Sequence, residues 1–245
     1  MITLSGLTKS YARGAVKAVN NLSLSVERGE IFGFIGPNGA GKTTTIKMIT
    51  GVLQPDEGRI AVGGVDMLTE PVRAKKLIGY VPDNHDIFDR LKGIEYLNFI
   101  GDVYGVPLKE RRERIEKYLT MFGIADAAGE LIRSYSHGMK QKLMLTGALI
   151  HKPPLWLLDE PLTGLDPKSA LSLKEEMRAH CREGNTVFFS THVLEVAERL
   201  CDRIGIIDRG RLAAVGTMDS LRSGEKDATL EKLFFELTEK PEASL

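Results

Sequence analysis

The chain lacks the features of a secreted, metal-clustered or membrane-spanning protein. Its two cysteines, Cys181 and Cys201, are too few and too far apart in sequence for a disulfide framework or a metal cluster, so we expect both in the core of a protein from a reducing compartment. No run approaches the ~18 to 20 apolar residues that a membrane-spanning helix needs. The N-terminus has no basic segment followed by a long apolar stretch, as a secretory signal does. Any membrane role is therefore expected to come through a partner.

An excess of charge of either sign is absent as well. Lysine plus arginine and aspartate plus glutamate each total 33, so the formal net charge is zero. Such a balance gives no support to a basic nucleic-acid surface, and no nucleic-acid partner is expected. What the chain does have is length and apolar content, because 245 residues with a hydrophobic fraction of 42% can build one large domain or two small ones.

A glycine-rich stretch carries the clearest signal. Residues 36–44 match Gly-x-x-x-x-Gly-Lys-Thr, after an apolar run typical of a buried strand and before a predicted helix. The glycines let the backbone N–H groups point inward, and the helix start adds its positive end. We expect a phosphate-binding loop in which Lys42 reaches the outer phosphates and the Thr43 hydroxyl holds Mg²⁺. The expected contacts are Gly36, Asn38, Gly39, Ala40, Gly41, Lys42, Thr43 and Thr44.

Two acidic residues end a second apolar run, at residues 154–158. Asp159 is expected at the tip of a buried strand that neighbours the strand of the phosphate loop, where it can bind Mg²⁺ through the water shell of the ion. Successive strand residues point in opposite directions, so Glu160 can instead face the outermost phosphate as the base or orienter of an attacking water. A solvated strand end is the alternative, and the phosphate loop upstream disfavours it.

A histidine ends the strand predicted at residues 186–192. His192 lies at the start of a predicted helix, so it can donate a hydrogen bond to a phosphate oxygen. Without the other motifs, a surface histidine would be the commoner explanation. The remaining histidines show no such placement and are interpreted as structural or solvated: His85, His137, His151 and His180.

Two further candidates stay open on local grounds. Ser136 is placed to cap a helix, and with Gly138 and the free N–H groups of the helix start it can form a second anion site, although a plain cap is the simpler interpretation. Tyr11 can stack on a nucleotide base or simply pack at a strand end. The helix after Ser136 is expected to bury one stripe of residues, namely Met139, Leu143, Thr146, Gly147 and Ile150.

The spacing of apolar residues predicts an α/β fold with a helical insertion. Residues 2–7 and 18–26 alternate in polarity, as half-buried antiparallel strands do. From about residue 93 to residue 149 the strand signals vanish and helical spacing takes over. A polar linker at 223–227 precedes a short amphipathic helix, which we expect to pack on the body or on another protein.

Taken together, these stretches resemble the ATP-binding subunit of ABC transporters over nearly all of residues 1–222. Residues 36–44 match Walker A, and residues 155–160 match Walker B with its catalytic glutamate. Residues 135–139, followed by Lys140-Gln141, look like a variant of the Leu-Ser-Gly-Gly-Gln signature that separates this family from other P-loop proteins.

Three single residues extend the resemblance. Tyr11 falls at the adenine-stacking aromatic, Asp166 in the D-loop and His192 at the switch histidine. The resemblance therefore implies ATP and Mg²⁺ as cofactors and an ATPase in which Glu160 and His192 are catalytic. It also implies nucleotide contacts from Tyr11, Ser136, Gly138 and Asp166.

The implied architecture is a P-loop NTPase core with a RecA-like parallel sheet, an N-terminal antiparallel β-subdomain and an inserted α-helical subdomain at about residues 88–150. The ATPase domain would span residues 1–222, and residues 223–245 would hold the linker and the C-terminal helix. The family works as a head-to-tail dimer, with itself or a paralogous ATPase, that drives a separate membrane permease from the cytoplasmic face of the membrane. The segments 230–238, 82–83 and Gly138–Gln141 look similar to exporter-type (ABC-2) subunits.

The sequence departs from the family at two places. Asp83 stands where glutamine is usual; its carboxylate can still reach Mg²⁺ or the water, so it is carried as a metal-site residue. Tyr135, His137 and Met139 replace the common signature residues. Two rival functions remain: a soluble ABC-type ATPase acting on nucleic acid or the ribosome, which the absence of sustained heptads disfavours, and a regulatory module without turnover, which Glu160 and His192 disfavour.

Overall fold

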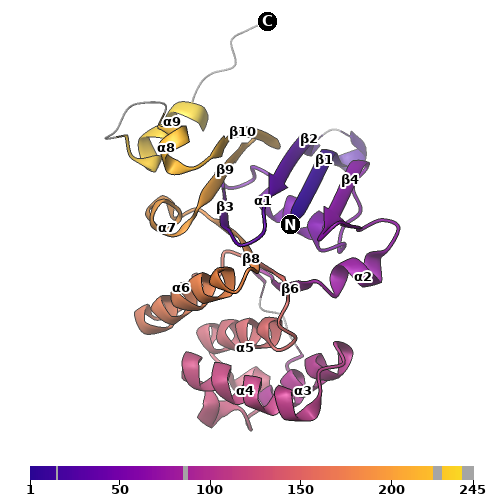
Figure 1. The fold of residues 1–245 in the computed structure, drawn as a ribbon, viewed down its shortest axis with the longest axis vertical. Helices are drawn as coiled ribbons and strands as arrows, with labels where there is room; N and C mark the ends of the chain where they lie inside the picture. Colours follow the sequence, from indigo (N-terminus) through magenta and orange to yellow (C-terminus); the bar gives the residue numbers. More distant parts are fainter. Residues whose placement is uncertain (15, 85–87, 223–227, 239–245) are drawn as a thin grey trace, which may run out of the picture.

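The structure, a computed structural model, describes residues 1–14, 16–84, 88–222 and 228–238. His85 and the linker predicted at 223–227 lie outside the described residues. Over the described ranges, no helix combines the length and the apolar character that crossing a membrane requires. The predicted α/β class is confirmed, because the chain folds into a mostly parallel sheet and an antiparallel sheet with helices around them (Figure 1).

The strands build two sheets. Among the described residues, the larger sheet has the order β10-β9-β3-β8-β7-β6 and the smaller has the order β2-β1-β4-β5. In the larger sheet only the β10·β9 pair is antiparallel, whereas every pair in the smaller sheet is antiparallel. The strands are β1 (Ile2–Tyr11), β2 (Val16–Val26), β3 (Ile31–Ile35), β4 (Glu57–Val62), β5 (Val65–Asp66), β6 (Ile78–Val81), β7 (Leu155–Asp159), β8 (Thr186–Thr191), β9 (Arg203–Asp208) and β10 (Arg211–Gly216).

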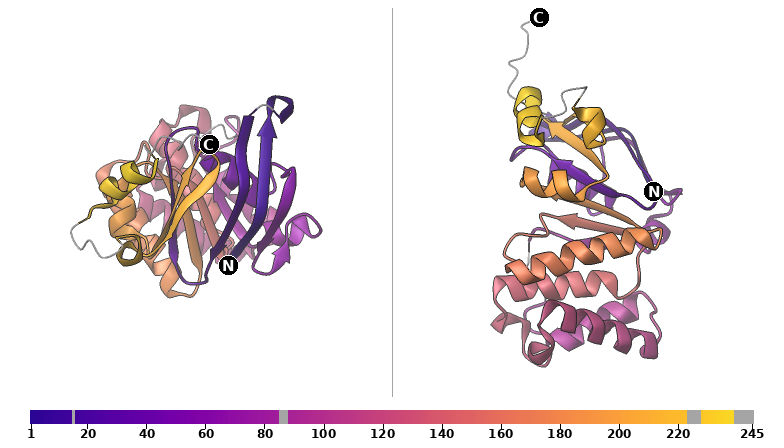
Figure 2. Two further views of the ribbon diagram at one scale, coloured as in Figure 1. Left: turned by 90° about the horizontal axis from the view of Figure 1, so that it is seen from above. Right: turned by 60° about the vertical axis from the view of Figure 1, so that its left-hand side comes forward.

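The helices surround the larger sheet (Figure 2). α6 and α5 cover one face in turn, with α3 and α4 beyond them, while α1 and the smaller sheet lie on the other face. They are α1 (Lys42–Ile49), α2 (Pro71–Lys75), α3 (Gly93–Val103), α4 (Leu108–Phe122), α5 (His137–Leu149), α6 (Pro167–Arg182), α7 (Leu194–Leu200), α8 (Met218–Leu221) and α9 (Leu230–Thr238), with 3-10 turns η1 (Ala12–Gly14), η2 (Ala125–Ala127) and η3 (Ile132–Ser134).

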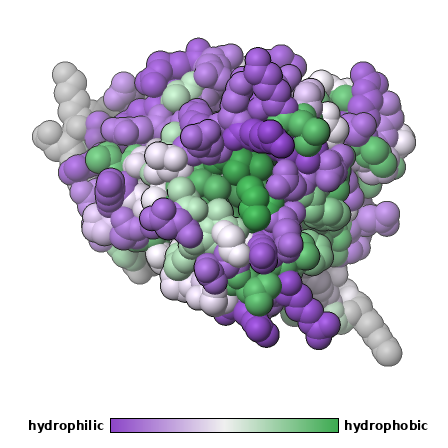
Figure 3. Space-filling model, turned by 90° about the horizontal axis from the view of Figure 1, so that it is seen from below, coloured by the Kyte–Doolittle hydropathy of each residue, from purple (hydrophilic) through white to green (hydrophobic). Residues whose placement is uncertain are grey.

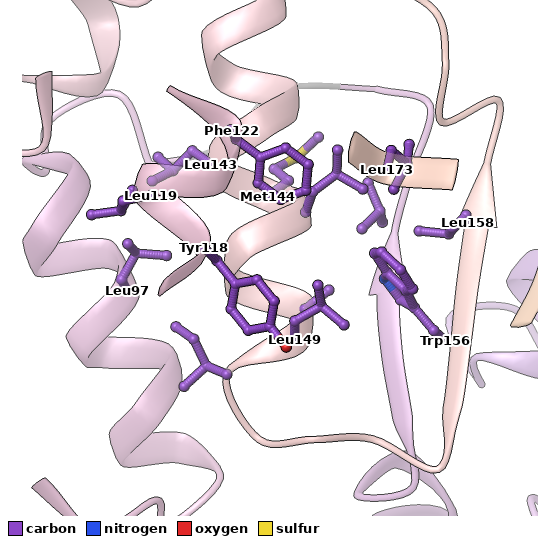
Figure 4. Packing of buried hydrophobic residues seen from close by; sticks show 14 of the residues in the cluster. Leu97, Tyr118, Leu119, Phe122, Leu143, Met144, Leu149, Trp156, Leu158 and Leu173 are labelled. Atoms are coloured by element: carbon purple, nitrogen blue, oxygen red, sulfur yellow. The ribbon is translucent and has the colours of Figure 1, made fainter. Parts of the chain in front are cut away.

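The larger sheet separates two cores, because its strands are buried on both faces. Along β7, Trp156 and Leu158 pack with the helical side, whereas Leu155 and Leu157 pack with α1 and the smaller sheet. This is the period of two expected of a strand, and it explains why β7 reads as a continuous apolar run rather than an alternating one. Figure 4 shows the helical core, where side chains of α4 and α5 meet Trp156.

Two expectations need correction. The strand that ends in Asp159 does not directly neighbour the strand of the phosphate loop, because β8 lies between β3 and β7. The order of strands in a parallel sheet depends on the crossovers, which local sequence does not encode. In addition, α5 is buried nearly all round from Leu143 to Leu149 rather than along one stripe, and Met139 is only half-buried. The helix is enclosed because α3 and α4 cover it on the side away from the sheet.

The C-terminal helix α9 packs on the body of the molecule. Leu230 is fully buried, and Phe234 and Leu237 contact a small core formed by β3, β9 and α7. The sequence left open whether this apolar face packs on the body or on another protein, and the structure shows it on the body.

Candidate active site

The glycine loop is held between two strands by close backbone packing. Gly41 is the N-cap of α1 with φ of 109°, a left-handed conformation that favours glycine. A Cβ atom on Gly41 would collide with the carbonyl of Ala18 in β2, and one on Gly36 would collide with the carbonyl of Ile207 in β9. No side chain caps α1, so its first N–H groups stay available to an anion.

Lys42 projects into this loop from the first turn of α1. The side chain is buried, and Nζ donates to the carbonyl oxygens of Gly36 at 2.6 Å and Pro37 at 3.3 Å. Burial lowers the pKa of Lys42, while the charges of Glu160 and Asp159 act in the opposite direction. Among the described residues, the hydrogen-bond partners of this buried cation are these two neutral carbonyls, and such a cation gains strongly from a phosphate partner.

Asp159 lies at the end of β7 and is almost completely buried. Ser190 near the end of β8 donates its hydroxyl to Oδ1 at 2.6 Å, whereas Oδ2 is buried without a hydrogen-bond partner among the described residues. Burial raises the pKa of Asp159, and the side chains of Ser190 and Thr43, which act as hydrogen-bond donors to the carboxylate, oppose that rise. A buried carboxylate oxygen without a partner is costly unless it meets a cation or a bound water, so this donor set suits a hydrated divalent ion.

Glu160 and His192 form a pair just after the C-terminal ends of β7 and β8. His192 Nδ1 lies 2.9 Å from Glu160 Oε2, and because a carboxylate only accepts, Nδ1 is the donor. Glu160 has φ of 49°, which is unusual for a residue other than glycine. Its backbone N–H donates to the Ser190 hydroxyl at 3.0 Å. Ser190 therefore links both acidic residues; the sequence analysis missed it, although its position one residue before the end of β8 was readable.

Lys42 and Glu160 border a pocket of about 220 Å³, whereas Asp159 and His192 lie outside its lining. Asp83 reaches it from the end of β6 and Glu160 from the end of β7. Ala18 is a lining residue that the sequence analysis missed, since alanine carries no chemical signal. The pocket is lined by Ala18, Pro37, Asn38, Gly39, Gly41, Lys42, Thr43, Thr44, Asp83 and Glu160.

The other predicted residues do not line this pocket. Gly36 and Ala40 belong to the loop but are buried within it. Tyr11 lies at the end of β1, opposite Val16, with 44% of its surface exposed. Ser136, Gly138 and Asp166 lie on α5 and at the start of α6, outside the pocket lining.

The start of α5 forms a separate, exposed site. Ser136 is its N-cap, and its hydroxyl accepts from the N–H of Met139 at 3.3 Å, as predicted. A Cβ atom on Gly138 would lie 2.6 Å from the carbonyl oxygen of Gly164, so only glycine allows this close approach.

Two side chains that the sequence analysis missed fix α5 to the segment after Glu160. Gln141 is fully buried and donates from Nε2 to the carbonyl of Pro161 at 2.9 Å. Lys142 Nζ lies 2.6 Å from Asp166 Oδ2, and this contact, with the hydrogen bonds from Ser169, lowers the pKa of Asp166. Helix α5 and the segment that follows Glu160 are thus held together as one unit.

The fold and the pocket define a P-loop nucleotide-binding ATPase, and comparison with known proteins identifies the family. Residues 19–163 match the model of the ABC transporter family. The chain is 40% identical to the linearmycin resistance ATP-binding protein LnrL of Bacillus subtilis (strain 168) over 223 residues, which are 91% of this chain and 71% of the relative.

Two solved structures agree. An ATP-binding subunit of an ABC transporter superimposes with a TM-score of 0.92 at 34% identity, covering 97% of this chain and 99% of the other. The ATP-binding cassette MJ0796, in a dimeric post-hydrolysis state with ADP and Pi, superimposes with a TM-score of 0.81 at 25% identity, covering 89% and 99%. The chain belongs to the ABC transporter family, as an ATP-binding subunit that hydrolyses ATP to drive transport.

Proposed function

We propose that this chain is the motor of an exporter and that two copies, or one copy and a paralogue, bind ATP head to tail. The observation that carries the proposal is that the pocket around Lys42 is half a site. Lys42 and Glu160 border it, while Ser136 and Gly138, the second anion-binding candidates, do not. A partner in the opposite sense brings its Ser136 helix start to the outer phosphates, and ATP then closes the dimer through contacts that exist only in the closed state.

Within each site the proposed roles follow from the contacts. Lys42 and the N–H groups of the loop hold the β- and γ-phosphates. The Thr43 hydroxyl, the free Oδ2 of Asp159 and the Asp83 carboxylate would hold Mg²⁺; when bound, this ion neutralises charge on the phosphates. Tyr11 supports the base from the end of β1, and Asp166 faces the partner near the phosphates.

Hydrolysis requires a base and a group that orients it. Glu160 accepts a proton from water as the water oxygen bonds to the γ-phosphorus and the bond to the bridging oxygen breaks, leaving ADP and phosphate. His192, 2.9 Å from the Glu160 carboxylate, holds this base in place through Nδ1, and with a second proton on Nε2 the ring also donates to the γ-phosphate as the nucleotide enters.

A membrane permease is the proposed partner, which places the chain at the cytoplasmic face of the membrane. Exposed apolar side chains support a docking surface on the helical side: Phe88 and Phe99 contact edge to face with ring centres 5.8 Å apart, and Val103 is 57% exposed. Apolar side chains gather on the face seen from below, which is the side of α3 and α4 (Figure 3). The export direction rests on relatives such as LnrL, whose name records resistance to linearmycin.

The test is the Glu160→Gln variant. It should bind ATP as the wild type does, hydrolyse it about 10²- to 10⁴-fold more slowly because the base is gone, and accumulate as a dimer in size-exclusion chromatography with ATP. Glu195→Gln, an exposed glutamate on α7, is the matched control. Wild-type turnover by Glu160→Gln, or full activity of a strictly monomeric chain, would refute the proposal.

A further inference from the structure

The C-terminal helix α9 packs against the helix that follows His192. α7 begins two residues after His192, and its Ala197 is fully buried in a small core that includes Leu230 and Phe234 of α9. The same core contains Ile35, the last residue before the glycine loop. A helix as short as α7 is not stable by itself, because isolated helices below about 12 residues are marginal in water. Its position is therefore set by packing, and α9 supplies part of that packing.

One carboxylate fastens the two helices at the point where α9 starts. Glu198 of α7 accepts from the guanidinium of Arg222 at 2.9 Å through Oε1 and from the N–H of Leu230 at 3.2 Å through Oε2. Arg222 also donates from Nε to the carbonyl of Ala228 at 2.8 Å. Both carboxylate oxygens of Glu198 are therefore in use: one accepts from Arg222 after α8 and the other from Leu230 at the start of α9. The side chain of Glu198 is only 25% exposed, so the ion pair is better shielded than a surface pair.

We propose that Glu198, Arg222 and α9 position the ATPase switch: they hold α7 so that His192 stays against Glu160. This inference rests on the proposed role of His192. None of the three touches the nucleotide pocket, so they are positioning elements and not catalytic residues. The C-terminal segment, outside the part of the chain that matches the family model, then sets the rate of hydrolysis rather than the affinity for ATP.

Kinetic measurements distinguish this positioning role from a merely structural one, because the two predict different changes in kcat and KM. Loosening α7 misplaces the His192 side chain while leaving the glycine loop intact, so the kcat falls and the KM for ATP does not. General loss of stability would instead alter binding and catalysis together. Hydrogen exchange adds a second readout, because the peptide at 186–200 should exchange faster and the peptide at 36–44 should not.

The experiment compares two variants that break the same contact from opposite sides, Glu198→Ala and Arg222→Ala, in the full-length chain. Each should lower kcat about tenfold, leave the KM for ATP within twofold, and raise exchange in residues 186–200. Glu195→Ala is the matched control and should match the wild type, since Glu195 lies on the same helix but is 71% exposed and pairs with the similarly exposed surface residue Arg199.

Each outcome decides one point. If both variants keep the wild-type kcat, or if kcat and KM change together with faster exchange throughout the chain, the positioning role is wrong. His192→Ala tests the underlying proposal separately. If His192→Ala itself keeps the wild-type kcat, the proposed role of His192 fails; if it loses activity while the other two variants do not, only the inference about α9 fails.

Discussion

The two helix starts that we assign to phosphate binding, at α1 and at α5, are built in opposite ways. The start of α1 has no side-chain cap and holds the buried cation Lys42, whose hydrogen-bond partners in the described part of the chain are backbone carbonyls. The start of α5 is exposed, capped by its own Ser136, and its Lys142 is already paired with Asp166 at 2.6 Å.

This difference indicates which of the two helix starts can bind a phosphate without a second copy of the chain. Free N–H groups and an unsatisfied cation give α1 a large gain from a phosphate. The α5 start gains less, because its cap already satisfies one N–H group and its lysine is neutralised. We therefore expect nucleotide to bind first at α1, and α5 of another copy to add the weaker contacts that turn binding into dimer closure.

The largest effect is expected from Lys42→Ala. It removes the cation that distinguishes α1 from α5, and ATP affinity should fall at least about 100-fold, since several hydrogen bonds to a charged group are worth about 1.5–3 kcal/mol each. Loss of the ATP-induced rise in melting temperature measures this. Lys47→Ala, an exposed lysine at the other end of the same helix, is the control. If ATP still raised the melting temperature of Lys42→Ala as it does for the wild type, Lys42 would not be what makes the α1 start a stronger phosphate site than the α5 start.

Gln141→Leu should sharpen the comparison by loosening α5. Removing the donor leaves the buried carbonyl of Pro161 unpaired, which should cost about 1–3 kcal/mol in the free energy of unfolding. Urea denaturation measures the loss. Gln54→Leu changes an exposed glutamine and should be nearly neutral. Equal stability of the two variants would mean that the link from α5 to the segment after Glu160 contributes nothing.

Ser136→Ala tests the α5 start directly. The lost cap should cost about 1 kcal/mol of stability, and ATP-induced dimerisation in a Glu160→Gln background should weaken about tenfold, as expected for one lost hydrogen bond to phosphate. Binding of ATP to the monomer should not change. Ser134→Ala, which changes an exposed serine whose hydroxyl donates to the Leu131 carbonyl, is the control, and analytical ultracentrifugation is the measurement. If Ser136→Ala weakened ATP binding to the monomer, Ser136 would act in the pocket of its own chain, and its assignment to the partner's site would be wrong.

The smallest effect is expected from Asp83→Gln, which restores the residue usual in the family. Burial raises the pKa of Asp159, and the charge of Asp83 adds to the rise. Removing that charge should weaken divalent-ion binding about threefold, because carboxylate ligands set the affinity of such sites. Mn²⁺ titration followed by electron paramagnetic resonance, in the presence of ADP, measures it directly. Unchanged or tighter binding would show that Asp83 takes no part in holding the ion.

Much of the fold was readable because it rests on local patterns. The loop at 36–44, the strand runs and the helical block from 93 to 149 are encoded by neighbouring residues, through glycine conformation and apolar spacing. The pairing of Gln141 with Pro161 and of Glu198 with Arg222 was not readable, since these partners are brought together by packing and carry no shared motif.

The sequence by itself indicated an α/β nucleotide-binding protein, because a phosphate loop needs glycines and a lysine at fixed spacing that few other sequences provide. The signature-like stretch at 135–141 then carried the resemblance to the ABC family. Only the tertiary structure decided that β8 separates β3 from β7, that Ser190 joins Asp159 to Glu160, and that α9 lies on the helix after His192. Those contacts join residues far apart in the chain, and their geometry follows from how the helices and sheets pack rather than from any local preference.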